Sequence, residues 1–131
     1  MLRNFIGIVG YEKVFDCGHL LGKYFKDELG IDLNVEAIPR NYPTNNEHQY
    51  IINALLSVGF VRIPVEGAYQ KGDAIVYRAD VTNRYCIATC VDDVQALIMR
   101  KWSRLIHIDR LENKIQCFRH KSLMSVGVTN D

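Results

Sequence analysis

The sequence lacks the features that would assign it to several classes of protein. No hydrophobic run approaches the length of a membrane span, and the N-terminal MLRNFIGIVGYEKV has no continuous apolar core, so we expect neither a membrane-spanning helix nor a signal peptide. The formal net charge is +1 and no run of lysine and arginine is longer than Arg100-Lys101, which argues against a nucleic-acid surface. The four cysteines include no CxxC pair, which favours a reducing compartment over a disulfide scaffold.

The composition is that of an ordinary soluble globular protein. At 131 residues, with 48% hydrophobic and 24% charged residues, the chain is long enough to bury a core without metal or disulfide support. We therefore expect one domain over residues 1–131. It divides into a lead-in arm (1–14), a helical part (15–59), a β-sheet part (60–120) and a tail (121–131).

The most informative stretch is FDCGHLLGKYFKDELGIDL, residues 15–33. Its leucines and aromatic residues recur at helical spacing, Asp16 is a favourable N-cap, and Gly30 suits a helix C-terminus. Cys17 falls in the first turn, where the helix dipole and free amides favour a thiolate. The alternative is that Cys17 is a small packed residue, as most free cysteines are.

A second helix is predicted from about Asn46 to Val58, and the sequence after it has the pattern of β-strands and turns. Residues 60–64 look extended, and short β-rich runs separated by turn residues follow. These candidate strands are Ala74–Arg78, Tyr85–Val91, Val94–Arg100, Leu105–Asp109 and Lys114–His120. Helices followed by closely spaced strands predict an α+β fold, in which the cysteine-bearing helix packs on one face of a meandering antiparallel sheet.

Three motifs, taken in this order, carry a resemblance to a known family. They are the Asp16-Cys17-Gly18-His19 helix with its Leu29-Gly30-Ile31 exit, the strand opened by Gln70-Lys71-Gly72-Asp73, and the strand running from Cys86 to the acidic turn Asp92-Asp93. In this the chain resembles the NlpC-type cysteine peptidases of the papain-like superfamily, and most of all the versions found among siphophage tail-tip proteins. The resemblance runs from about Phe5 to His120 and implies a papain-like NlpC-type domain.

The resemblance also implies an active site, which needs a thiolate, a histidine base and a polar group to orient that histidine. Cys17 takes the nucleophile position. Alignment on Val91-Asp92-Asp93 places Cys86 at the base position, with Tyr85 there if the alignment shifts by one residue. The orienting position falls on Ile98. Both partners of the nucleophile are therefore replaced.

Other residues offer weaker alternatives. His19 lies about 200° around the helix from Cys17, whereas His48, His107 and His120 could reach Cys17 only through the tertiary fold. Cys86 and Cys90 point to the same face of a strand but are about 13 Å apart, and no metal-ligand spacing is present. We expect no cofactor and no metal.

Two functions follow from the resemblance. In the first, the protein is a structural component of the virion, located in a bacteriophage tail tip after synthesis in the host cytoplasm, and binds other tail-tip proteins. Its contact surface could include Lys101-Trp102-Ser103-Arg104, or that stretch could be a solvated turn. In the alternative, the protein is an active peptidoglycan endopeptidase or amidase that acts during genome delivery.

Overall fold

The computed structural model describes residues 2–8, 17–35, 47–66, 68–79, 84–99 and 102–124. The helices are α1 (Cys17–Tyr24), which continues into a π-helical turn (Phe25–Leu29), and α2 (Glu47–Ser57). The strands are β1 (Phe60–Ile63), β2 (Ala74–Ala79), β3 (Arg84–Cys90), β4 (Gln95–Met99), β5 (Ser103–His107) and β6 (Lys114–His120). Short 3-10 turns span Leu2–Phe5, Ile108–Arg110 and Lys121–Leu123.

The first helix ends where the sequence predicts, but its last turn is wider than an α-helix. Gly30 adopts a left-handed conformation (φ +68°), and its amide donates to the carbonyl of Phe25, five residues back. The buried stripe of this helix is Leu20, Leu21, Tyr24 and Phe25, as the helical spacing indicates. The Asp16 cap lies outside the described residues.

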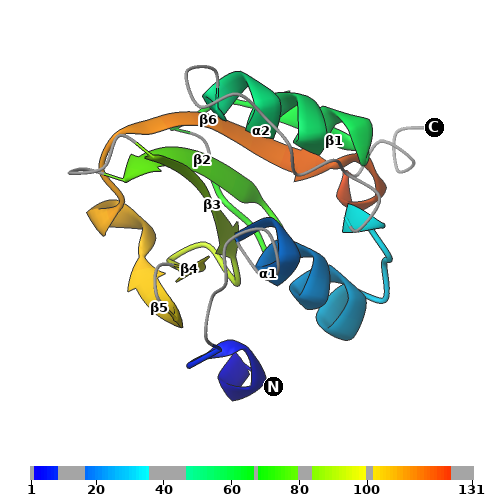
Figure 1. The fold of residues 1–131 in the computed structure, drawn as a ribbon, viewed down its shortest axis with the longest axis vertical. Helices are drawn as coiled ribbons and strands as arrows, with labels where there is room; N and C mark the ends of the chain where they lie inside the picture. Colours follow the sequence, from blue (N-terminus) through cyan, green and yellow to red (C-terminus); the bar gives the residue numbers. More distant parts are fainter. Residues whose placement is uncertain are drawn as a thin grey trace.

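The six strands form one antiparallel sheet in the order β1-β6-β2-β3-β4-β5. Strands β2 to β5 follow one another as the predicted meander, and Figure 1 shows the sheet curving strongly with α1 and α2 on one side. Strand β6 departs from the meander because it returns to lie between β1 and β2. The α+β class and the packing of the helix on an antiparallel sheet are confirmed.

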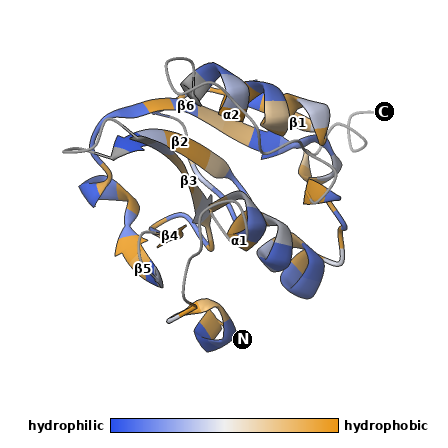
Figure 2. Cartoon of the chain, viewed as in Figure 1, coloured by the Kyte–Doolittle hydropathy of each residue, from blue (hydrophilic) through white to orange (hydrophobic). Residues whose placement is uncertain are grey.

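Both faces of the sheet are buried. The face that carries the helices contributes Val76, Ile87, Leu97 and Phe118 to one cluster with the α1 stripe. The opposite face builds a second cluster that includes Ile75, Ala88, Ala96, Ile98 and Cys117. Along α2, hydrophilic and hydrophobic residues alternate, as expected of a helix with one face on the sheet (Figure 2).

The turn that opens β2 is held by a buried ion pair. The Asp73 side chain is fully buried and accepts from Arg119 at both oxygens, with Nε–Oδ1 and Nη2–Oδ2 distances of 2.8 Å. The amide of Gln70 donates to the same carboxylate, and Arg119 also donates to the carbonyl of Ala68. The carboxylate therefore joins the QKGD turn to the neighbouring strand β6.

The lead-in arm is attached to the outer edge of β5. The amide of Gly7 donates to the Ser103 carbonyl, the Ser103 amide donates to the Ile8 carbonyl, and Gly7 has φ +83°. These are the features of a bulge that opens with a left-handed glycine. Phe5 is buried against Tyr24, with ring centroids 5.2 Å apart, so this residue of the arm is part of the core.

The buried ion pair gives a stability prediction. Arg119→Met leaves the Asp73 carboxylate buried without its counter-ion, so we expect the free energy of unfolding to fall by about 3 kcal/mol. Lys23→Met is the matched control, because it breaks an exposed pair with Asp27 and should cost about 0.5 kcal/mol or less. Urea denaturation of both variants measures this difference. Equal losses would contradict the role given to the pair.

Candidate functional site

Cys17 is the first residue of α1. It is half-buried and packs against the cluster on the helix-bearing face of the sheet. The apolar stripe that follows it holds α1 over β3 and β4. Cys17 therefore lies where α1, β3 and β4 meet, and the residues of these strands decide its chemical surroundings.

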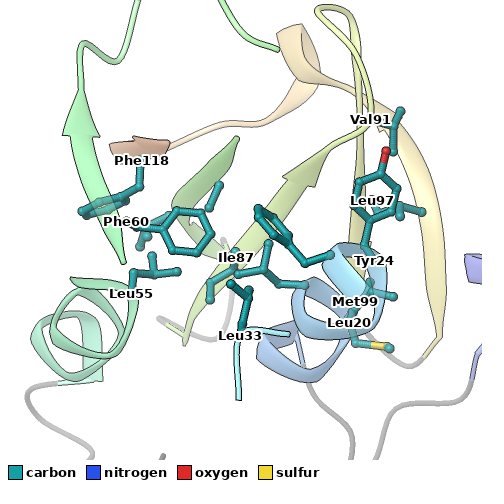
Figure 3. Packing of buried hydrophobic residues seen from close by; sticks show 14 of the residues in the cluster. Leu20, Tyr24, Leu33, Leu55, Phe60, Ile87, Val91, Leu97, Met99 and Phe118 are labelled. Atoms are coloured by element: carbon teal, nitrogen blue, oxygen red, sulfur yellow. The ribbon is translucent and has the colours of Figure 1, made fainter. Parts of the chain in front are cut away.

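The direction of α1 shows which end of the strands lies near Cys17. Tyr24, at the far end of α1, is close to the turn that follows β3, and Figure 3 shows its hydroxyl pointing toward Val91. Burial raises the pKa of Tyr24 to about 12, with further contributions from the carboxylates of Glu28 and Asp92. The eight-residue helix rises about 10 Å, so Cys17 lies about that far along α1 from Tyr24, in the helix that contacts β3 and β4.

The alternation of side chains decides which strand residues face α1. Ile87 and Val91 near the end of β3, and Leu97 and Met99 on β4, belong to the cluster under α1. Successive strand residues point to opposite faces, so Tyr85 shares the face of Ile87. The strand residues on this face are therefore aromatic or aliphatic, apart from Thr89 and Gln95.

The structure does not bring Cys17 together with Cys86 or Ile98. Cys86 packs against the second cluster, on the opposite face of the sheet, and Ile98 belongs to that cluster. Both residues therefore lie on the face of the sheet opposite the one on which Cys17 packs, and the roles that the resemblance gives them stay predictions. Tyr85, which the shifted alignment places at the base position, shares the face that α1 covers. In β4 the residue on that face is Leu97 and not Ile98.

The other cysteines are packed residues of the second cluster. Cys90 and Cys117 are fully buried, and burial raises the pKa of both thiols. Cys117 also lies 3.7 Å from the Tyr69 hydroxyl. Buried thiols with raised pKa values are poor nucleophiles, so Cys17 is the better nucleophile position.

Two of the four histidines are positioned away from Cys17. The amide of Val91 donates to the carbonyl of Gln95, and His107 pairs with Gln95, so His107 lies across the sheet from the end of β3 that Tyr24 approaches. His120 lies on β6, two strands from β3, and both of its ring nitrogens are engaged elsewhere. His19 is buried on α1 itself, and the side chain of His48 lies outside the described residues.

The described residues contain no group of three or more His, Cys, Asp or Glu side chains arranged to hold a metal ion. Within the same residues, no helix is both long enough and apolar enough to cross a membrane. A scan against protein-family models gives no match to this chain, and a search of curated proteins gives none either.

One polar group under α1 was not predicted from the sequence. The Thr89 side chain is fully buried, and its hydroxyl has no hydrogen-bond partner in the described part of the chain. Its strand partner Ala74 belongs to the cluster under α1, so the hydroxyl is enclosed by apolar side chains. An unsatisfied buried hydroxyl destabilises a fold because its hydration is lost without compensation.

We therefore expect Thr89→Val to raise the free energy of unfolding by about 1 kcal/mol. The matched control is Ser103→Ala, because the equally buried Ser103 hydroxyl accepts a 2.9 Å hydrogen bond from the amide of Ile8. That change should lower the free energy of unfolding by about 1 kcal/mol. Thermal or urea unfolding of both variants tests the contrast, and a loss of stability in Thr89→Val would show that its hydroxyl is satisfied in solution.

Proposed function

We propose that this protein is a structural component of a bacteriophage tail tip, built on an NlpC-type peptidase fold that has lost catalysis. One observation carries the loss of catalysis. The strands β3 and β4, on which the Cys17 helix packs, read RYCIATC and QALIM and contain no histidine, aspartate or glutamate. The family resemblance carries the assignment to a tail tip.

The chemistry explains why these strands matter. A cysteine peptidase uses an imidazole to take the thiol proton and to deliver it to the leaving amine, and such assistance is typically worth about 10²–10⁴-fold in rate. Tyr85 offers a phenol where the family uses an imidazole. Leu97 offers no group that could orient one. The site that the resemblance implies is therefore an apolar continuation of the core.

A surface near β5 supports the structural role. Trp102, which precedes β5, is 55% exposed, and Arg104 on the same strand is also exposed. Exposed tryptophan and arginine are the residue types most enriched at the energetic centres of protein interfaces. This favours contact with other tail-tip proteins, and the location that follows is the virion.

The alternative function is an active peptidoglycan endopeptidase or amidase. The position of Cys17 favours it, because a half-buried cysteine in the first turn of a helix has the environment that nucleophilic cysteines use. Such an enzyme would require a base from outside β3 and β4. His48, whose side chain lies outside the described residues, is the histidine whose place does not exclude that role.

Muropeptide digestion distinguishes the two functions. Purified wild-type protein and Cys17→Ala are incubated with muropeptides, and the products are analysed by mass spectrometry. We expect no cleavage by either, from folded and monodisperse samples, together with detection of the protein in purified tail particles. Cleavage by the wild type that disappears in Cys17→Ala would replace the structural function with the enzymatic one.

A pair of histidine substitutions tests which residue of β3, Tyr85 or Cys86, lies on the face of the sheet that α1 covers. Tyr85→His places an imidazole on the face that α1 covers, whereas Cys86→His places it on the opposite face. We expect Tyr85→His to increase the rate at which iodoacetamide alkylates Cys17 at pH 7 several-fold, because the imidazole favours the thiolate.

Cys86→His is the matched control for that experiment. It should leave the alkylation of Cys17 unchanged, create no hydrolysis, and lower stability because a polar ring enters an apolar cluster. Peptide mass spectrometry assigns the modified cysteine. Acceleration by Cys86→His, and not by Tyr85→His, would show that the assignment of faces is reversed.

A further inference from the structure

His120, the last residue of β6, occupies a buried site between four other elements. Its ring lies 5.6 Å from that of Phe25 and 5.2 Å from that of Phe60, measured between centroids. Its side chain also reaches the end of α2 and the 3-10 turn Lys121–Leu123. The ring therefore connects the helices to the edge of the sheet.

The partners of the two ring nitrogens define the protonation state. Nε2 lies 3.0 Å from the carbonyl of Val58, which can only accept, so Nε2 carries a proton. Nδ1 lies 3.2 Å from the amide of Ser122, which can only donate, so Nδ1 must present its lone pair. The Ser122 hydroxyl, 2.7 Å from Nδ1, is free to donate as well. Only the neutral imidazole satisfies all these partners.

The backbone is shaped to admit the ring. Gly59 has φ +103°, and a Cβ atom added there would lie 2.8 Å from Nε2 of His120. The amide of Lys121 donates to the carbonyl of Gly59 at 2.9 Å, which ties the same turn to the end of α2. A glycine at this position therefore allows the close contact between α2 and the end of β6.

A second bridge extends the connection to the turn before β2. The Leu123 side chain lies against Gly72, where an added Cβ atom would be 2.7 Å from Leu123 Cδ1. Gln70 Nε2 donates to the carbonyl of Leu123 at 3.3 Å. The 3-10 turn thus holds together the end of α2, the end of β6 and the Lys71-Gly72 turn.

Among the side chains that the structure describes, no carboxylate is positioned to stabilise a charged ring. The 3-10 turn contributes the positive charge of Lys121, which acts on the ring and has the same sign as an imidazolium. In the π-helical turn that carries Phe25, Asp27 pairs with Lys23 and Glu28 pairs with Lys71. The two elements that meet the ring from the other sides contribute the Val58 carbonyl and the Phe60 ring.

The charges of the outer strand are also directed elsewhere. Arg62 of β1 donates to Gln116 at 2.7 Å, and Arg119, beside His120 on β6, binds Asp73. Burial, the largest effect, lowers the pKa of His120, and Lys121 lowers it further, whereas the bond to Val58 raises it. The net shift is downward, in agreement with the geometry.

We propose that His120 is an acid-sensitive clasp, in which protonation of Nδ1 releases the turn Lys121–Leu123 from the end of α2 and from the Lys71-Gly72 turn. The added proton points at the Ser122 amide, so the hydrogen bond that caps the turn is lost. Protonation also puts a positive charge in a buried site, where the charged ring loses its hydration.

The direction of the pH dependence follows from the lowered pKa. The closed clasp is fully favoured above the value of a free histidine, about 6.5. As the pH falls below that value, the open state takes up a proton that the closed state excludes, and the opening equilibrium rises by up to about tenfold per pH unit. The increase stops once the pH is below the lowered pKa of the closed state.

Amide hydrogen exchange of the full chain between pH 7.5 and 5.0, corrected for intrinsic exchange, tests the clasp. We expect the protection of Lys121 and Ser122 to fall several-fold below about pH 6.5, while the protection of β3 amides stays constant. His107→Gln, a substitution of an exposed histidine, should leave this behaviour unchanged, and His120→Gln should abolish the pH dependence.

Should His120→Gln fail to fold, the wild-type protein provides an independent test. Titration of the His120 ring by NMR is expected to give a midpoint below 6.5, with the Ser122 amide shift following the same midpoint. A midpoint at or above 6.5, or a pH dependence of protection that disappears in His107→Gln, would overturn the proposal.

Discussion

The burial of both faces of the sheet is the constraint on which this structure depends. In a strand with one solvent-exposed face, a shift of one residue in the pairing register moves apolar side chains into water. In this sheet the side chains on either face point into a packed cluster. Strands β3 and β4 are accordingly apolar along almost their whole length. Which of their residues faces Cys17 is decided by the register of the sheet and the position of α1, and not by the hydrophobic pattern of the strand.

That constraint explains what remains at the candidate site. The positions under the first turn of α1 are occupied by side chains that pack, and the same side chains that stabilise the helix on the sheet leave no imidazole beside the thiol on β3 or β4. A polar pair at these positions would need hydrogen-bond partners that an apolar interface does not supply. Under the proposed function, replacing the base and the orienting residue by side chains that pack would also extend the core.

Much of the fold was predictable because local signals agreed. The stripe of α1, the stop at Gly30, the span of α2 and the positions of the strands all follow from helical spacing, strand alternation and turn residues. The return of β6 between β1 and β2 was not predictable, since it depends on long-range pairing. The π-helical turn after Tyr24 was missed because nothing in its local pattern distinguishes it from an α-helix.

The candidate site was predictable only in part, because both faces of its strands are buried. Cys17 could be placed by its helix, whereas Cys86 and Ile98 were selected by alignment. The structure puts both on the face opposite Cys17, and in a strand buried on both sides the hydrophobic pattern does not distinguish the two faces. The buried Thr89 hydroxyl and the neutral His120 gave no signal in the sequence, because each is defined by neighbours from distant segments.

The most direct test of the central claim is a nuclear Overhauser measurement between the β protons of Cys17 and protons of β3. The account predicts cross-peaks from Cys17 to the ring of Tyr85 and none to the β protons of Cys86, because these two residues point to opposite faces of the sheet. Cross-peaks from Cys17 to Cys86, without any to Tyr85, would contradict the assignment of faces and with it the case for a site that has lost its base.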